Sequence, residues 1–283
     1  MIELKKEYAL FGNKIEIVIY IEDTFLGEDI LEELYLEAKR LQKIFNLYDS
    51  KSELSKLNEQ REIEASNHLI HVLKKALVFS EYTSGEYDVA QGKRILARKK
   101  GEKLPETNCS YKDIIIIGNK VKLENKDVLV DLGSLAKGYI TDVLANSLKE
   151  RGIEEGFIDS RGDMIAFGER GELINIQHPR KQGQMLAEFY VKNKAIATSG
   201  DYNQYDKHYE QSHIVGKKQT ISVTVLCEKL EDADVIATCL MLLNKTEQQE
   251  FLKKVDCSAI IINEEEGILT KSITHDLEIA VTL

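Results

Sequence analysis

The chain has 283 residues, of which 43% are apolar and 30% are charged, and its formal net charge is −10. This size and composition predict a globular protein with enough apolar residues to build a substantial core. The acidic balance argues against nucleic acid as a general partner, because no basic excess exists to neutralise phosphates. The sequence contains no apolar stretch that approaches the ~18 residues of a membrane-spanning helix.

The cysteine pattern gives no sign of a metal site or of a disulfide framework. Cys109, Cys227, Cys239 and Cys257 show neither Cys-x-x-Cys spacing nor histidine partners at zinc-binding spacing. Free thiols in a reducing compartment are the simplest interpretation. Residues 1–12 contain no apolar run of secretory length and no lipobox-like cysteine, so we expect a cytoplasmic protein.

The first part of the chain is predicted to form a β-hairpin followed by helices. Residues 3–22 are expected to form two β segments around a turn at Gly12-Asn13, and isoleucines alternate in the second segment at positions 15, 17, 19 and 21, which is typical of a hairpin. Helical spacing covers residues 28–47 and 67–82, and Ser52 can cap a short helical turn between them. Short apolar runs then predict three strands, at residues 114–117, 121–123 and 128–130.

The stretch from Val128 to Gly168 predicts a strand, a turn and an amphipathic helix. Ser134 is expected to cap this helix, and Arg151-Gly152 carries the signals that end it. The small residues around Gly133 leave backbone N–H groups free to face an anion, which suits a phosphate. A tight turn without a ligand is the alternative, and spacing alone favours it.

The remaining chain alternates between blocks of strands and blocks of helices. Strands are expected near residues 156–167, 173–177, 185–191, 195–198, 221–226, 258–262 and 268–269, and helices at residues 231–243 and 247–254. A polar loop covers residues 199–218. Since the blocks do not follow a strict βαβ order, we expect one α+β domain over residues 1–283, with mixed or antiparallel sheets and packed helices.

Two polar patterns in the second half suggest chemistry. Asp234 and Thr238 lie four residues apart, on one face of a predicted helix. A carboxylate and a hydroxyl one turn apart suit a hard cation such as Mg²⁺, although acidic residues are also common in a first helical turn. His213 lies in the polar loop, where it is either a general base or an ordinary surface residue.

In combination and in this order, the motifs of the chain resemble those of the ApbE family, the FAD:protein FMN transferases. The resemblance runs from about Phe11 to Leu243, and the family fold that it implies is T-fold-like. The matching segments are SELSKLN (52–58), Tyr87-Asp88, VDLGSLAKGY (130–139) with Asp142, Arg161-Gly162-Asp163, ATSGDY (197–202), SHI (212–214) and SVTV (222–225) followed by ADVIAT (233–238).

The resemblance implies an activity and a set of site residues. Members of the family are expected to split the pyrophosphate of FAD with Mg²⁺, attach FMN to a threonine or serine of an acceptor protein and release AMP. Asp234 and Thr238 would bind the metal together with the backbone carbonyl of Ile140, and His213 would take the proton of the acceptor hydroxyl. The positions implied to contact FAD are Phe11 and Tyr48 as an aromatic bed, Lys137 and Asp88, with Asp163 and Asp201 as loop-shaping or ligand-facing carboxylates.

Several segments depart from the family pattern. After His213-Ile214 the family usually has Asp-Pro-Arg-Thr-Gly, but this chain has residues 215–219 with the sequence VGKKQ. Arg161-Gly162-Asp163 replaces the usual Gly-Gly-Asp, and Gly133-Ser134 replaces a double glycine. Two alternatives to the transferase therefore stay open: an FAD-binding protein without transfer activity, and a hydrolase that converts FAD to FMN and AMP. The sequence leaves the oligomeric state open.

Overall fold

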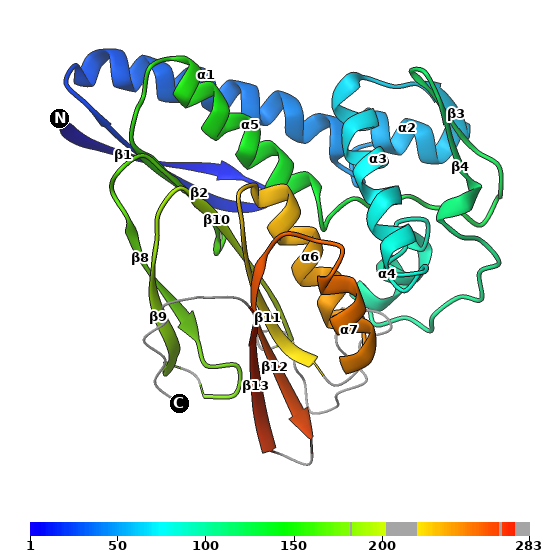
Figure 1. Cartoon of the computed structure of the whole chain (residues 1–283). Helices are drawn as coiled ribbons and strands as arrows, with labels where there is room; N and C mark the ends of the chain where they lie inside the picture. Colours follow the sequence, from blue (N-terminus) through cyan, green and yellow to red (C-terminus); the bar gives the residue numbers. More distant parts are fainter. Residues whose placement is uncertain (182, 202–219, 266–267, 275–283) are drawn as a thin grey trace.

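The computed structural model describes residues 1–181, 183–201, 220–265 and 268–274 (Figure 1). An eight-stranded sheet runs through this part of the chain, and every pair of neighbouring strands in it is antiparallel. In spatial order the strands are β1 (Ile2–Leu10), β2 (Asn13–Ile21), β6 (Gly156–Ser160), β7 (Asp163–Phe167), β10 (Lys194–Gly200), β11 (Thr220–Cys227), β12 (Ser258–Glu265) and β13 (Ile268–Thr274).

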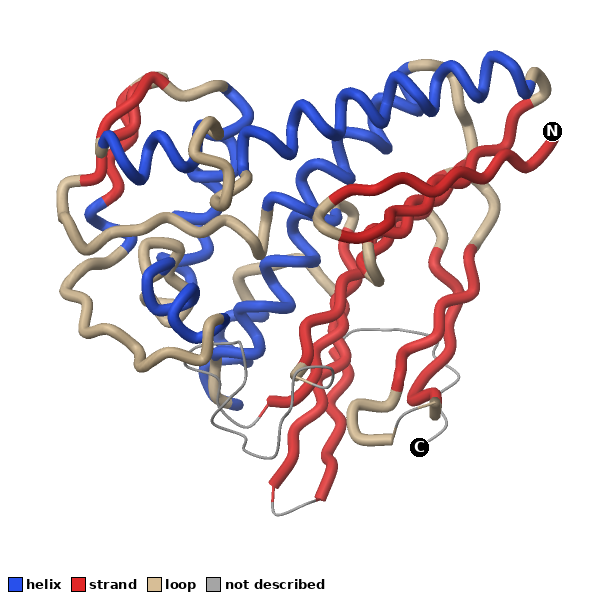
Figure 2. Tube along the Cα trace, turned by 180° about the vertical axis from the view of Figure 1, so that it is seen from behind, coloured by secondary structure: helices blue, strands red, loops and turns tan. Residues whose placement is uncertain are grey.

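The two faces of this sheet are covered by different elements (Figures 1 and 2). Helices α1 (Thr24–Phe45), α5 (Ala136–Glu150) and α6 (Leu230–Leu242) pack on one face. The hairpin of β8 (Glu172–Gln177) and β9 (Met185–Val191) packs on the other. The alternation of side chains along β10 follows from this arrangement: Ala195 and Ala197 face the helices, and Ile196 faces the hairpin.

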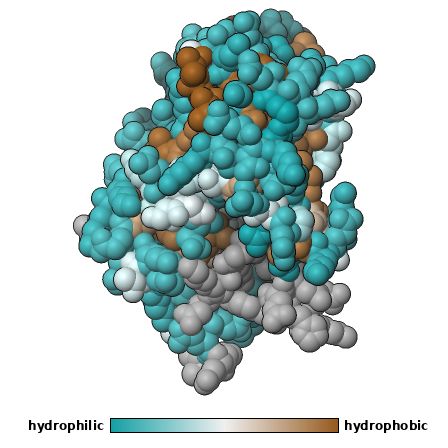
Figure 3. Space-filling model, turned by 90° about the vertical axis from the view of Figure 1, so that its right-hand side faces the viewer, coloured by the Kyte–Doolittle hydropathy of each residue, from teal (hydrophilic) through white to brown (hydrophobic). Residues whose placement is uncertain are grey.

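A smaller group of elements lies at the right of Figure 1. It contains α2 (Glu53–Gln60), α3 (Asn67–Tyr82), α4 (Gly92–Lys99) and the 3-10 turn η1 (Tyr111–Asp113). A small antiparallel sheet has the order β3 (Glu62–Glu64), β5 (Lys120–Leu123) and β4 (Ile114–Ile117). Helix α7 (Lys245–Leu252) follows α6. The surface on this side is mostly hydrophilic and is interrupted by smaller apolar areas (Figure 3).

The structure confirms the predicted α+β class and most of the predicted elements. The N-terminal hairpin, the helix at residues 67–82 and the strand at residues 114–117 form where their patterns placed them. Ser52 caps α2 by accepting a hydrogen bond of 2.9 Å from Ser55 N. None of the helices in the described part of the chain is long and apolar enough to cross a membrane.

The strand predicted at residues 128–130 was wrong. Only one isolated parallel bridge, between Gln91 and Leu129, forms there. On the side of this bridge, Leu129 N donates to Ala90 O at 3.1 Å and Leu129 O accepts from Gly92 N at 2.8 Å. On the other side, side chains take the place of a second strand: Asn58 exchanges two hydrogen bonds with Val130, at 2.7 and 3.0 Å, and Arg61 donates to Val128 O at 2.8 Å. These side chains come from α2 and its end, more than sixty positions away in the sequence, so local periodicity could not indicate them.

The expected cap of α5 was also wrong. Leu135 occupies the N-cap position and makes no side-chain capping bond. The hydroxyl of Ser134 instead pairs with the hydroxyl of Tyr87 at 2.9 Å. The end of α5 is as predicted, because Arg151 is its C-cap and Gly152 follows with φ of +83°. Ser134 is thereby directed toward the cavity described next.

Candidate active site

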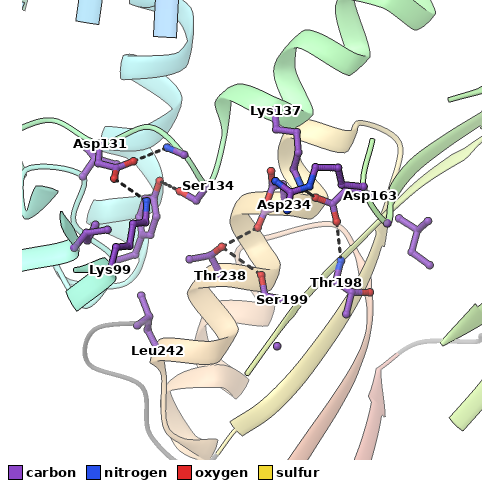
Figure 4. Close-up of a pocket in the computed structure, with 18 of the residues that line it drawn as sticks. Lys99, Asp131, Ser134, Lys137, Asp163, Thr198, Ser199, Asp234, Thr238 and Leu242 are labelled. Carbon is purple, nitrogen blue, oxygen red and sulfur yellow. Dashed lines mark hydrogen bonds and ion pairs between the residues drawn. The ribbon is translucent and has the colours of Figure 1, made fainter. Parts of the chain in front are cut away.

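A cavity of about 940 Å³ lies where the beginning of α5, the cavity-facing side of α6, the ends of β7 and β10 and helix α4 meet. This volume is at the upper end of the range for small-molecule sites. Figure 4 shows how the polar side chains of α5, α6 and β7 converge on it. Five of the residues predicted from the sequence line this cavity, namely Asp88, Lys137, Asp163, Asp234 and Thr238.

Asp234 lies in α6 with its carboxylate almost completely buried. Its Oδ2 atom has no hydrogen-bond partner among the described residues. Burial raises the pKa of Asp234 to about 6, although the charge of Lys137 and the backbone N–H of Gly138 act in the opposite direction. A buried carboxylate oxygen without a partner is costly. A bound cation would supply the interaction that the Oδ2 atom of Asp234 lacks among the described residues.

Thr238 lies one turn beyond Asp234 on the same face of α6 (Figure 4). Its hydroxyl donates to the backbone oxygen of Asp234 at 3.2 Å and lies 3.4 Å from the hydroxyl of Ser199. Ser199 comes from the end of β10. The structure thus places two hydroxyl oxygens and one unpaired carboxylate oxygen together, which the four-residue spacing of Asp234 and Thr238 predicted only in part.

Lys137 and Asp163 form an ion pair between the first turn of α5 and the first residue of β7. The second oxygen of Asp163 accepts a hydrogen bond of 3.1 Å from Thr198 N on β10. This pair fixes the ammonium group of Lys137 at the cavity, close enough to Asp234 for its charge to oppose the rise in the pKa of that carboxyl. A fixed ammonium group beside an oxygen-donor site suits a ligand with phosphate groups.

The donor atoms fit a hard divalent cation. Carboxylate and hydroxyl oxygens are ligands that Mg²⁺ accepts, and this ion usually keeps several positions for water and phosphate oxygens. The described residues contain no cluster of three or more His, Cys, Asp or Glu side chains that could hold a metal ion by themselves. The protein would therefore supply few ligands, and a bound phosphate ligand would complete the coordination.

The opposite wall of the cavity contains polar residues that the sequence analysis did not assign. Asp131 accepts a hydrogen bond of 2.8 Å from Gly133 N and lies 3.5 Å from the ammonium group of Lys99 on α4. Burial raises the pKa of the Tyr87 hydroxyl, which is paired with Ser134, well above its ordinary value. Asp131 and Ser134 belong to the VDLGSLAKGY motif, so that motif could have indicated them as residues of the site. Lys99 could not be indicated in this way, because the sequence analysis did not predict helix α4.

Three other predicted site residues, all in the described part of the chain, do not line the cavity. The Ile140 side chain is buried in the core, and the residue lies within α5. Phe11 has φ of +53° in the β1–β2 turn, and its carbonyl oxygen lies 3.4 Å from the guanidinium of Arg161. Tyr48 is 75% exposed. The roles of these three residues stay predictions.

Two further predicted residues lie at the polar loop. Asp201 is 1% exposed, and its carboxylate is paired with the guanidinium of Arg180 at 2.8 Å. His213 lies outside the described residues, as does most of the loop that was expected from Ser199 onward. The first two residues of that predicted loop, Ser199 and Gly200, are instead the end of β10.

Fold and site together define an α+β protein with a small-molecule cavity that contains an oxygen-donor site. The family model described as "ApbE family" matches residues 11–261. The chain therefore belongs to the ApbE family. A relative from Haemophilus influenzae named FAD:protein FMN transferase is 27% identical over 90% of this chain and 85% of its own length. One of the same name from Vibrio cholerae is 29% identical over 70% and 68%.

Solved structures show the same fold. The flavin transferase ApbE from Vibrio cholerae superposes with a TM-score of 0.79 at 23% identity and covers 96% of this chain and 97% of its own. The apo form of the Pseudomonas stutzeri flavinyl transferase ApbE gives a TM-score of 0.83 at 17% identity, with coverages of 96% and 94%. At such identities the comparison shows the fold alone. With curated relatives at 22–29% identity, the chain is a divergent member of the family.

Proposed function

We propose that this chain transfers FMN from FAD to a threonine or serine of an acceptor protein in a Mg²⁺-dependent reaction and releases AMP. The observation that carries the proposal is the buried Oδ2 atom of Asp234, which has no hydrogen-bond partner in the described part of the chain. It lies next to Thr238, in a cavity that also contains the ammonium group of Lys137. The names of the relatives support the reaction class. FAD is then the substrate and Mg²⁺ the cofactor.

Asp234 and Thr238 would hold the metal, with the backbone carbonyl of Ile140 as a third ligand by family resemblance. When bound, Mg²⁺ would supply positive charge to the pyrophosphate oxygens and to the leaving phosphate. Lys137 would orient the pyrophosphate from the α5 side, and Asp163 keeps its ammonium group in place. Because the ammonium group of Lys137 is already held in position, little free energy would be spent on moving it during the reaction.

The transfer step is a displacement at phosphorus. The oxygen of the acceptor hydroxyl forms a bond to the phosphorus on the FMN side, and the bond from that phosphorus to the bridging oxygen breaks, so that AMP leaves. The hydroxyl proton passes to His213, for which the family resemblance provides the support. Water in place of the acceptor hydroxyl would give free FMN and AMP.

The family resemblance assigns the roles of Phe11 and Tyr48, and surroundings in the structure support those of Asp88 and Asp201. Phe11 and Tyr48 would flank the isoalloxazine ring, since an aromatic bed suits a flat apolar group. Asp88 would contact FAD from the α4 side of the cavity, which it lines. The pairing of Asp201 with Arg180 supports a loop-shaping role for this carboxylate, because both of its oxygens accept hydrogen bonds from the guanidinium.

The test follows AMP release and covalent flavin in one sample that contains the purified chain, FAD, MgCl₂ and a peptide with an Asp-Gly-x-Thr segment. AMP and peptide-bound flavin should appear together and should disappear with a chelator. Asp234→Asn should lower the rate at least about a hundredfold, because the variant loses a charged metal ligand. Asp127→Asn makes the same change outside the cavity, at a carboxylate that pairs with Lys93, and should stay within a few-fold of the wild type.

Other outcomes identify the alternatives. AMP and free FMN without labelled peptide would indicate a hydrolase. Bound FAD without any AMP, with and without MgCl₂, would indicate a binding protein, and the transferase proposal would then be withdrawn.

A further inference from the structure

Two cysteines lie opposite each other at one end of the large sheet, outside the cavity described above. Cys227 is the last residue of β11, and Cys257 directly precedes β12. The register pairs Leu226 with Ser258, so Cys227 and Cys257 are the next opposed positions on the two strands. Opposed residues of antiparallel strands project to the same face. Both side chains accordingly belong to the core that faces the helices, and they are 3% and 6% exposed.

The register places the two thiols side by side. The single proton of the Cys227 thiol can be donated to the backbone oxygen of Asp256, 3.7 Å away, or to the sulfur of Cys257. Donation to Cys257 lowers the pKa of Cys257, against the effect of burial. Directly opposed residues of antiparallel strands have Cα atoms about 4.5–5.5 Å apart, and Cα separations of about 4.4–6.8 Å permit a disulfide. A bond between the two sulfurs would therefore need little movement of the backbone.

We propose that Cys227 and Cys257 are a dithiol site that hydrogen peroxide oxidises to a reversible intramolecular disulfide. The Cys257 thiolate attacks one peroxide oxygen and becomes a sulfenic acid, while the other oxygen leaves as hydroxide and takes up a proton to form water. Cys227 sulfur then attacks the Cys257 sulfur, and the sulfenic oxygen leaves as a second water. The two sulfurs lose two electrons in total, and peroxide gains them.

The position of this site links it to α6. Residues 228–256, between the two cysteines, contain both α6 and α7, and α6 carries Asp234 and Thr238. A disulfide around this segment would reduce the conformational freedom of the unfolded chain and thereby stabilise the folded one. The thiol site stands on the register of β11 and β12, so it does not depend on the proposed transferase activity.

The test treats the folded protein with hydrogen peroxide, blocks the remaining thiols by alkylation and analyses it by mass spectrometry. After alkylation the expected product carries two alkyl groups fewer than reduced protein treated in the same way. It contains one crosslink between the peptides with Cys227 and Cys257, and dithiothreitol added before alkylation removes that crosslink. The melting temperature should rise by several degrees on oxidation.

Single variants provide the controls. Cys227→Ser and Cys257→Ser should each lose both the crosslink and the rise in melting temperature. Cys109→Ser should keep both, because Cys109 lies in the smaller group of elements near Gln91. The proposal is overturned if peroxide leaves the two thiols free to alkylation, if it overoxidises them without a crosslink, or if the crosslink forms only in urea. The crosslink is measured in the wild-type protein, so the proposal can be tested even if one of the variants does not fold.

Discussion

Two arginines in the described part of the chain have a left-handed backbone conformation, and their guanidinium groups differ in the hydrogen bonds that they make. Arg161 has φ of +64° in the β6–β7 turn, and Arg61 has φ of +69° at the end of α2. The guanidinium of Arg161 makes one exposed contact of 3.4 Å, to Phe11 O. The guanidinium of Arg61 donates to the carbonyls of Asn58, Val128 and Asn125. A non-glycine residue in this region carries a steric cost that glycine avoids.

Arg161→Gly should therefore raise the free energy of unfolding by about 0.5–1 kcal/mol, because it relieves the backbone and removes little else. Arg61→Gly relieves the same backbone strain but leaves three carbonyls without their charged donor, so it should lower stability by about 1–3 kcal/mol. Urea denaturation of the two variants and the wild type measures both effects. If both substitutions raised, or both lowered, the free energy of unfolding, the difference in guanidinium hydrogen bonding would not explain the effects.

The contact between α5 and α6 is set by a glycine and a carboxylate. A Cβ atom on Gly138 would lie 2.6 Å from Leu230 O and 2.8 Å from backbone atoms of Glu231. Four residues later, Asp142 accepts hydrogen bonds from Leu230 N and Glu231 N at 2.8 and 2.9 Å. It thus caps α6, whose own N-cap residue makes no side-chain bond. The position of Asp234 depends on this contact.

Gly138→Ala should destabilise the protein by about 1–3 kcal/mol, because backbone atoms cannot move aside as a flexible side chain can. It should also weaken Mg²⁺ binding, because α6 would shift away from α5. Gly27→Ala in α1 is the matched control, since the nearest atoms there, at 2.9 Å and beyond, belong to the side chains of Leu4 and β2 residues. Thermal unfolding and Mg²⁺ titration measure the stability and the Mg²⁺ affinity of both variants. If both lost equal stability and equal affinity, the close contact of Gly138 with α6 would not be the cause.

Helices α3 and α6 are joined by a buried ion pair with a predictable pH dependence. Glu231 is 2% exposed and accepts hydrogen bonds from Lys75 at 2.8 Å and from the ring of His71 at 2.9 Å. Burial alone would raise the pKa of Glu231, but Lys75 and His71 lower it below its ordinary value of 4.5. A carboxyl with a lowered pKa in the folded state contributes stability above its ordinary pKa, and this contribution is lost as the pH falls through the lowered value.

Glu231→Gln should accordingly cost about 1–3 kcal/mol near pH 7, and the difference from the wild type should shrink below about pH 4. Glu62→Gln removes an exposed partner of Lys120 and should change little at either pH. Urea denaturation at pH 7 and at pH 3.5 measures both variants. A Glu231→Gln cost that is the same at the two pH values would show that charge is not the cause.

For the molecule as a whole, local patterns in the sequence predicted most elements but not their assembly. The periodicity of residues 67–82 identified α3, and the Gly12-Asn13 turn with the alternation in residues 15–21 identified the first hairpin. The order of strands in the large sheet, with β8 and β9 excluded from it, depends on which apolar faces meet, and no local pattern encodes that. The same applies to the site: the spacing of Asp234 and Thr238 was visible, whereas Ser199 joins them only through the fold.

Ligand binding should stabilise the molecule as a whole, because the cavity is lined by the large sheet, by α5 and α6 and by the smaller group of elements. A ligand at a hundred times its Kd adds about 2.7 kcal/mol, which corresponds to a melting temperature raised by roughly 5 °C for a chain of this size. FAD with Mg²⁺ should produce such a shift, and FAD with a chelator a smaller one. Asp234→Asn should keep the smaller shift and lose the Mg²⁺-dependent part, whereas Asp127→Asn, outside the cavity, should show both. An undiminished Mg²⁺-dependent shift in Asp234→Asn would place the metal elsewhere in the protein.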